Sequence, residues 1–193
     1  QVNYLNKNLF VDLGSAFRAT AVRSATSASI LYVPRDAKAS RYVFFDDLVG
    51  SGTQASVYLS KQIEAIRRDN PDIELKFMSL FSTPAGLAKM NAPNMFDGNA
   101  MCLFELDDTY KAFSADSRYF AGAPDWFDAV TMANIACYYG KKIKPGYQLG
   151  YKDGQLLLGF SHNTPDNTLN IFWDEGSLSP WAPVLIRYDK AYG

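Results

Sequence analysis

The stretch from Arg41 to Gln54 constrains the fold more than any other part of the chain. It begins with a short run of aromatic and β-branched residues, Tyr42 to Phe45, which is typical of a buried strand. Asp46 and Asp47 follow at once, and a loop of small residues, Gly50-Ser51-Gly52-Thr53-Gln54, then leads into a segment with helical periodicity. This order predicts an α/β fold in which a ligand lies beyond the carboxyl end of the strand.

The acidic pair and the loop together suit a sugar phosphate. Backbone N–H groups of a glycine loop close around a phosphate, and the N-terminus of the following helix adds the positive end of its dipole. Two carboxylates can accept hydrogen bonds from vicinal ribose hydroxyls or hold a divalent cation such as Mg²⁺ against them. We therefore predict that Asp46 and Asp47 bind ribose and metal, and that residues 50–54 bind phosphate. The alternative is one acid that caps the loop and another that is solvated.

The elements around this stretch favour a mainly parallel sheet flanked by helices. Helical spacing extends from Thr53 to Arg68, and an apolar strand pattern follows at Ile73 to Phe81. Two strands joined by one helix form a right-handed parallel crossover. Other strands are expected at Asn8–Asp12, Ser29–Val33 and Ala100–Leu106, and other helices at residues 84–90 and at Pro124–Tyr139. The expected core stripe of the last helix consists of Trp126, Phe127, Val130, Ala133 and Cys137.

The C-terminal part differs in character and predicts a β-rich cap. Two apolar segments, Tyr147–Tyr151 and Gln155–Phe160, bracket Lys152-Asp153-Gly154, which is a β-turn signal. We expect one domain over residues 1–193, with an α/β core at about 1–145 and an elaboration at about 146–193. Because the chain begins at Gln1 rather than Met, we expect a fragment or a processed product from which earlier elements are missing.

A polar segment within this elaboration is the second candidate for function. It contains the single histidine of the chain, His162, followed by Asn163, Thr164, Asn167 and Thr168. Asn and Thr side chains bond readily to local backbone, so a structural turn is one interpretation. The other is a polar wall over the ribosyl ligand, in which His162 acts as an acid–base or hydrogen-bonding group.

Composition and motifs narrow the class of protein. The chain is 48% hydrophobic and 20% charged with a net charge of -1, which predicts a globule without general attraction to nucleic acid or membrane. No apolar run approaches the roughly 20 residues of a membrane helix. Cys102 and Cys137 lie in apolar patterns, which predicts buried thiols in a reducing, cytoplasmic location. A multi-histidine zinc site is excluded by the single histidine.

A dinucleotide-binding site is the main rival. Gly50 to Ala55 formally fits Gly-x-Gly-x-x-Ala. In that fingerprint the first glycine normally follows its strand directly, and an acid ends the next strand about 20 residues on. Here the acidic pair intervenes, and Glu74 stands at the start of the next strand, so the sugar-phosphate interpretation is favoured.

The stretch resembles the phosphoribosyl-pyrophosphate motif of type I phosphoribosyltransferases. In that family the two acids face the ribose hydroxyls and the loop binds the 5′-phosphate, which the resemblance assigns to Asp46, Asp47 and residues 50–54. Gly50 and Gln54 depart from the Thr or Ser usual at their positions. The resemblance also implies an earlier loop for pyrophosphate, for which Gly14 to Arg18 is the upstream candidate, although an ordinary strand-to-helix turn explains it as well.

A second resemblance extends from about Tyr42 to Arg187. The segments that carry it, in order, are residues 45–54, 111–114, 149–151, 162–169, Trp173 and residues 181–183. Together they resemble the phosphoribosyltransferase-like effector family of bacterial conflict systems. The resemblance implies a cytoplasmic antiphage effector that binds a nucleotide or phosphoribosyl pyrophosphate, with partners such as a winged-helix protein or a retron reverse transcriptase and its nucleic acid. Two functions stay open: an enzyme of transferase or nucleotide-glycosidase type, and a non-catalytic nucleotide sensor.

Overall fold

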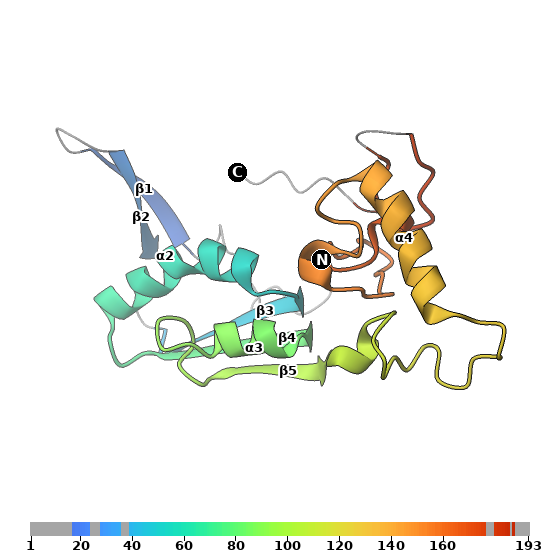
Figure 1. The fold of residues 1–193 in the computed structure, drawn as a ribbon. Coiled ribbons are helices and arrows are strands. Elements are labelled where there is room, and N and C mark those ends of the chain that lie inside the picture. Colours follow the sequence, from blue (N-terminus) through green and yellow to red (C-terminus); the bar gives the residue numbers. More distant parts are fainter. Residues whose placement is uncertain (1–16, 24–27, 36–38, 177–179, 186, 188–193) are drawn as a thin grey trace. The chain divides into compact units, whose positions relative to one another are not determined.

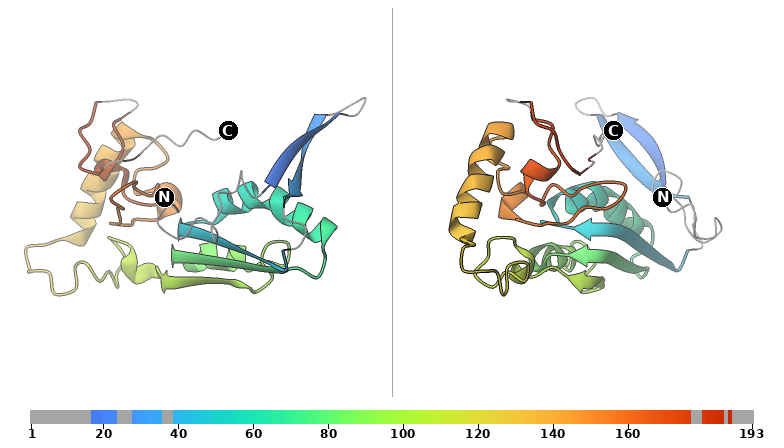
Figure 2. Two further views of the ribbon diagram at one scale, coloured as in Figure 1. Left: turned by 180° about the vertical axis from the view of Figure 1, so that it is seen from behind. Right: turned by 90° about the vertical axis from the view of Figure 1, so that its right-hand side faces the viewer.

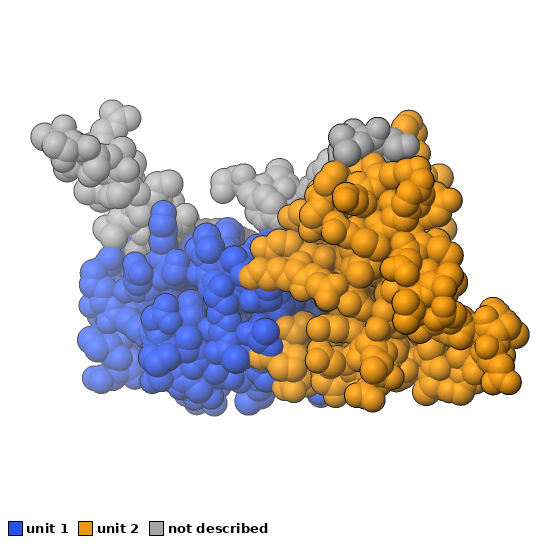
Figure 3. All heavy atoms as spheres, viewed as in Figure 1, with its two compact units in different colours: residues 1–80, 85–103 blue, residues 81–84, 104–193 orange. Residues whose placement is uncertain are grey.

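The structure is a computed structural model that describes residues 17–23, 28–35, 39–176, 180–185 and 187 (Figure 1). The chain divides into two compact units, shown in Figure 3. Unit 1 comprises residues 1–80 and 85–103, and unit 2 comprises residues 81–84 and 104–193. Each unit is described by itself below.

Unit 1 is built on a parallel sheet in the order β3-β4-β5, and its strands point the same way in Figure 1. The strands are β3 (Arg41–Val49), β4 (Glu74–Ser82) and β5 (Ala100–Glu105). Helix α2 (Thr53–Asp69) connects β3 to β4, and the short α3 (Pro84–Met90) connects β4 to β5. The predicted α/β class, with a parallel sheet flanked by helices, is confirmed for this unit.

One face of α2 forms the core of unit 1 because its apolar residues recur at helical spacing. Leu59, Ile63 and Ile66 are buried there, and the aromatic ring of Phe96 packs against the rings of Phe44 and Phe77 at centroid distances of 5.4 and 5.2 Å. Side chains that alternate with the buried ones along the strands are exposed, as expected where one face of a sheet is covered. The large ones are Val43, Phe45, Met78, Leu80, Met101 and Leu103.

A hairpin precedes the parallel sheet. Strand β1 (Phe17–Arg23) pairs antiparallel with β2 (Ala28–Pro34), from Phe17 opposite Pro34 to Arg23 opposite Ala28. The strand expected at Ser29–Val33 is confirmed within β2, but it belongs to this separate two-stranded sheet. The strand-to-helix turn expected at residues 14–18 is wrong where the structure describes it, because Phe17 and Arg18 already belong to β1. Residues 14–16 and the strand expected at 8–12 lie outside the described residues.

Unit 2 is mainly irregular around one long helix. Its elements are η2 (Asp108–Tyr110), α4 (Ala129–Ile143), η3 (Tyr151–Asp153) and η4 (Asn170–Phe172). The β-rich cap is not confirmed: in the described part after residue 146, the β pairing is one isolated bridge, Leu156 to Thr168.

The backbone around η3 explains why the expected hairpin does not form. Lys152 and Asp153 have positive φ angles of 52° and 56°. The flanking amides bond to a distant segment: Tyr151 N–H donates to Asp166 O at 2.7 Å, and Leu156 N–H donates to Asn167 O at 3.1 Å. These bonds replace the ladder between Tyr147–Tyr151 and Gln155–Phe160.

Helix α4 begins five residues later than predicted, and its buried face is different. Asp128 is the N-cap and accepts a hydrogen bond from Val130 N–H at 3.0 Å. The buried residues are Ala136, Gly140 and Ile143, whereas Val130 is 69% exposed. The predicted core stripe is therefore wrong at Val130 and at Trp126, which is 82% exposed, whereas Phe127, Ala133 and Cys137 are half-buried. Gly140 faces inward, where the Asn170 side-chain amide donates to Gly140 O at 2.9 Å and a Cβ atom would overlap Gln148 O.

Two further expectations concern the cysteines and the membrane. Cys102 and Cys137 are free thiols, and both are only partly buried. Within the described ranges, no helix combines the length and the apolar character that crossing a membrane requires.

Candidate functional site

The two acids lie at the carboxyl end of β3, as predicted from the sequence. The strand continues through them to Val49, which is buried and anchors its end. Asp46 is exposed and Asp47 is half-buried. Each carboxylate accepts a hydrogen bond from the next backbone amide: Asp47 N–H donates to Asp46 Oδ1 at 2.9 Å, and Leu48 N–H donates to Asp47 Oδ1 at 2.8 Å. These bonds hold both carboxylates beside the strand end.

The loop after the acids turns the chain directly into α2. Gly52 is the N-cap with φ of 67°, a left-handed conformation that glycine adopts at little cost. This N-cap has no side-chain acceptor, and the first turn of α2 contains no acidic residue. The hydroxyls of Ser51 and Thr53 lie 3.2 Å apart. The N-terminus of a long helix, with two hydroxyls beside it, is therefore suited to an anion.

Helix α3 packs against this loop through a glycine that the sequence analysis did not identify. A Cβ atom on Gly86 would lie 2.2 Å from Gly50 O and 2.6 Å from Val49 O. Glycine is therefore required for the close approach of α3 to the loop. The signal in the sequence was a glycine inside a short helical segment, which often marks close packing.

Lys89 is the second residue that the sequence analysis missed. It lies one helical turn after Gly86 in α3, and its Nζ donates to Thr53 Oγ1 at 3.3 Å. Its side chain is half-buried. The structure thus places a cation, from the helix that connects β4 to β5, beside the loop predicted to bind phosphate. No local pattern indicated the contact between Lys89 and Thr53, since 36 positions separate the two residues.

The polar segment of unit 2 is mostly internal to that unit. Thr164 and Thr168 are fully buried, and Asn167 is 6% exposed. The Asn167 amide donates to Tyr151 O at 3.0 Å, and the Thr168 hydroxyl donates to Leu158 O at 2.5 Å. These bonds support the interpretation as a structural turn.

His162 and Asn163 are half-buried at the start of this segment. The imidazole of His162 stacks on the ring of Phe160 with a centroid distance of 5.6 Å, and the backbones of Phe160 and Asn163 bond to each other. These residues belong to unit 2, whereas the acids and the loop belong to unit 1. A shared pocket wall, and an acid–base role for His162, stay predictions.

The donor set fits Mg²⁺ that arrives with a ligand. Asp46 and Asp47 offer carboxylate oxygens, and Mg²⁺ in proteins is commonly held by one or two carboxylates together with substrate phosphates and water. Within the described residues, no group of three or more His, Cys, Asp or Glu side chains is positioned for a metal. The ligand oxygens would therefore complete the coordination.

A second acidic pair, Asp107 and Asp108, follows β5, and Asp107 has a capping role. Asp107 is the N-cap of η2, where its carboxylate accepts from both the N–H and the hydroxyl of Thr109. The hydrogen bond from the Thr109 hydroxyl, followed by the one from the Thr109 N–H, holds the pKa of Asp107 below its usual range. Asp107 is therefore engaged in capping η2.

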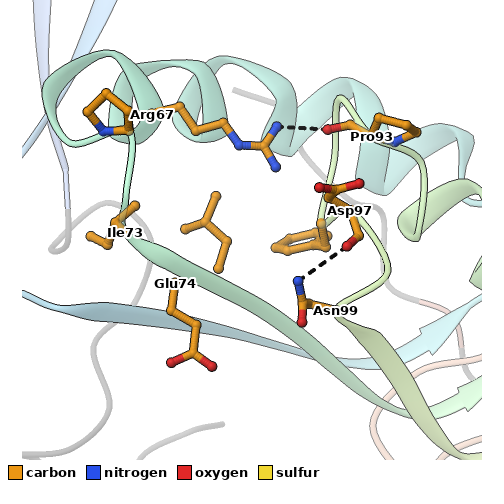
Figure 4. Close-up of a pocket in the computed structure, with 9 residues that line it drawn as sticks. Arg67, Ile73, Glu74, Pro93, Asp97 and Asn99 are labelled. Carbon is orange, nitrogen blue, oxygen red and sulfur yellow. Dashed lines mark hydrogen bonds between the residues drawn. The ribbon is translucent and has the colours of Figure 1, made fainter.

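A depression in unit 1 lies away from the acids. It is lined by the last turn of α2, the start of β4 and the segment before β5, with Arg67, Glu74 and Asp97 among its residues (Figure 4). The guanidinium of Arg67 donates hydrogen bonds there to Pro93 O at 3.1 Å and to Met95 O at 2.6 Å. Because the depression lies where β4 and β5 begin, it is at the amino ends of the strands. Parallel sheets bind ligands at the opposite ends.

The parallel crossover, the acids at a strand end and the glycine loop that opens a helix define a phosphoribosyltransferase-like α/β protein. The family model for PRTase-CE matches residues 2–187, nearly the whole chain, and the chain therefore belongs to the PRTase-CE family. No curated protein matches the chain.

Proposed function

We propose that this protein binds a nucleotide or phosphoribosyl pyrophosphate and acts at ribose C1 with Mg²⁺, as an antiphage effector in the cytoplasm. The observation that carries the proposal is the continuous path from Asp46 and Asp47, at the end of β3, through Gly52 into the N-terminus of α2. Membership of the PRTase-CE family supports it.

In this proposal each part of the site has one role. The loop of residues 50–54 holds the 5′-phosphate with backbone N–H groups and with the hydroxyls of Ser51 and Thr53. Asp46 and Asp47 accept hydrogen bonds from the ribose hydroxyls and hold Mg²⁺. Bound Mg²⁺ would supply positive charge to the phosphate oxygens of the ligand. The carboxylates also stabilise the positive charge that develops at C1 when its bond breaks.

A non-catalytic nucleotide sensor, controlled by a protein or nucleic-acid partner, is the second candidate. The observation that favours it is the conformation of Phe17 and Arg18, which belong to a strand of the β1–β2 hairpin and not to a pyrophosphate-binding loop. A winged-helix protein, or a retron reverse transcriptase with its nucleic acid, would be such a partner. A sensor needs the phosphate loop and the acids to bind its ligand, but it needs no chemistry at C1.

The experiment incubates the purified protein and Mg²⁺ with nucleotides, NAD and phosphoribosyl pyrophosphate, and measures product by chromatography and ligand binding by thermal shift. The test variant is Asp46→Asn/Asp47→Asn. The matched control is Asp69→Asn/Asp72→Asn, which makes the same charge change at exposed acids near the end of α2 and the start of β4. Wild type and control are expected to release product, and the test variant is expected to release none.

The outcomes separate the two candidates. A thermal shift without product, lost in the test variant, would favour the sensor. Absence of both signals with every ligand would contradict the proposal. The defence role is tested separately by counting phage plaques on two bacterial strains. Both strains express the partners of the defence system, one with the wild-type protein and the other with the Asp46→Asn/Asp47→Asn variant. Equal protection would refute a role of this site in defence.

A further inference from the structure

We propose that Lys89 binds the phosphate group held by the loop of residues 50–54, so that this site recognises a phosphate monoester with a lysine ammonium as well as with backbone amides. The proposal rests on the proposed function in one respect, since both place a phosphate at this loop. It does not depend on ribose, Mg²⁺ or catalysis.

The position of Lys89 is fixed by backbone packing. A Cβ atom on Gly52 would lie 3.1 Å from Lys89 Cβ and 3.2 Å from Gly86 O, so α3 lies directly against the N-cap of α2. Gly86 permits this approach because any side chain there would overlap Gly50 O. The base of the lysine side chain is therefore held against the loop, and only its outer part is adjustable.

The ammonium group reaches the polar side of the loop. Lys89 Nζ lies 3.3 Å from Thr53 Oγ1, and Thr53 Oγ1 lies 3.2 Å from Ser51 Oγ. The hydroxyls of Ser51 and Thr53 and the ammonium of Lys89 thus form a chain of hydrogen bonds beside the first turn of α2. Ammonium and hydroxyl groups are both donors to phosphate oxygens.

The charges in this arrangement indicate an anionic ligand. Lys89 belongs to the last turn of α3, where a cation suits the dipole of that helix, but its ammonium group also reaches the N-terminus of α2, where the dipole is already positive. The first turn of α2 has no acidic residue that offsets this. Within the described part of the chain, no carboxylate forms an ion pair with Lys89, whose recorded partner is the neutral Thr53 hydroxyl. A bound anion would offset both positive charges at once.

The chemistry of lysine narrows the ligand to a terminal phosphate. An ammonium acts as a compact point charge with three donors, and it does not select the planar carboxylate geometry that arginine does. A phosphate monoester carries nearly two negative charges near pH 7, so its interaction with Lys89 exceeds that of a singly charged diester. We therefore infer preference for a free 5′-phosphate over a phosphate buried within a polynucleotide backbone.

The test measures binding of inorganic phosphate and of ribose 5-phosphate by isothermal titration calorimetry at low ionic strength, without Mg²⁺. The variants are Lys89→Gln and Lys89→Arg, with Lys61→Gln as the matched control, because Lys61 is an exposed lysine of α2. We expect Lys89→Gln to weaken both ligands by about tenfold or more, the scale of one charged hydrogen bond. Lys61→Gln is expected to change binding by less than about twofold, and Lys89→Arg to retain part of the affinity.

The outcomes distinguish this proposal from the proposed function. Equal phosphate binding by Lys89→Gln and wild type would overturn the role of Lys89, as would absence of phosphate binding by the wild type at millimolar concentration. Phosphate binding that depends on Lys89 would support it. If, in addition, phosphoribosyl pyrophosphate bound no better than phosphate and Asp46→Asn/Asp47→Asn had no effect, Lys89 would stand as a phosphate ligand while the proposed function failed. Hydrogen exchange over β3 and α3 checks that each variant is folded.

Discussion

Replacement of Gly86 by alanine tests whether close packing of α3 against the loop stabilises unit 1. The new Cβ would lie 2.2 Å from Gly50 O, whereas real contacts of this kind are not shorter than 3.0 Å, so the two atoms must separate by at least about 0.8 Å. The methyl group would also meet Val49 O at 2.6 Å. Both acceptors are backbone atoms at a strand end, which cannot rotate away as a flexible side chain does.

The expected loss combines two opposing effects. Overpacking costs up to about 3 kcal/mol, and the upper end applies because backbone must move. Alanine is the better helix former by about 1 kcal/mol, which offsets part of that cost. We therefore expect Gly86→Ala to lower the free energy of unfolding by about 2 kcal/mol. If propensity alone governed this position, the same change would stabilise the protein.

The assay must report on unit 1. All three tryptophans, Trp126, Trp173 and Trp181, belong to unit 2, so tryptophan fluorescence is unsuitable. Urea unfolding followed by far-UV circular dichroism, with hydrogen exchange of peptides from β3 and α3, measures the relevant change. A loss of about 2 kcal/mol lowers the urea midpoint by roughly 1 M.

A matched control separates packing from propensity. Ala88→Gly changes an exposed position of the same helix and should cost about 1 kcal/mol by propensity alone. The reasoning is refuted if Gly86→Ala is as stable as wild type or more stable, while Ala88→Gly loses the amount expected.

Two further predictions concern unit 2 and the pH dependence of stability. Gly140→Ala should destabilise unit 2 by about 1–2 kcal/mol, because its Cβ would lie 2.4 Å from Gln148 O and 2.5 Å from Asn170 Oδ1. Tryptophan fluorescence in urea suits this measurement, and an unchanged midpoint would contradict it. The pKa of Glu74 is lowered by its hydrogen bonds first from Lys76 and then from Arg41. A lowered pKa in the folded state stabilises the protein above the ordinary value of 4.5 and stops doing so as the pH falls below it. Wild type should therefore be slightly more stable than Glu74→Gln at pH 7, and the difference should shrink as the pH drops from 5 to 3. A difference independent of pH would show that the ion pairs are not its cause.

The central part of the fold was predictable because its signals are local. The strand at Tyr42–Phe45 and the helix at Thr53–Arg68 correspond to β3 and α2, each extended at its C-terminal end. Periodicity over a few residues fixes such elements, and the small residues at 50–54 fix the turn between them. The positions of the acidic pair and of the loop at residues 50–54, at the end of β3, were therefore predicted correctly.

Predictions failed where distant segments compete for the same backbone or the same face. Helix α4 begins after Trp126, which is exposed, and it buries Gly140, where the Asn170 side chain bonds to the backbone oxygen. Helical periodicity alone cannot predict this contact. The turn at Lys152-Asp153-Gly154 does not form a hairpin because the amides of Tyr151 and Leu156 bond to residues 166–167.

The sequence by itself determined the order of strand, acids, loop and helix, and with it the class of ligand we propose. Only the tertiary structure decided what surrounds the loop. Gly86 and Lys89 meet Gly52 and Thr53 across more than thirty positions, through packing of α3 against the loop. Such contacts follow from how a whole unit buries its apolar surface, and no local pattern of residues specifies which distant positions will meet.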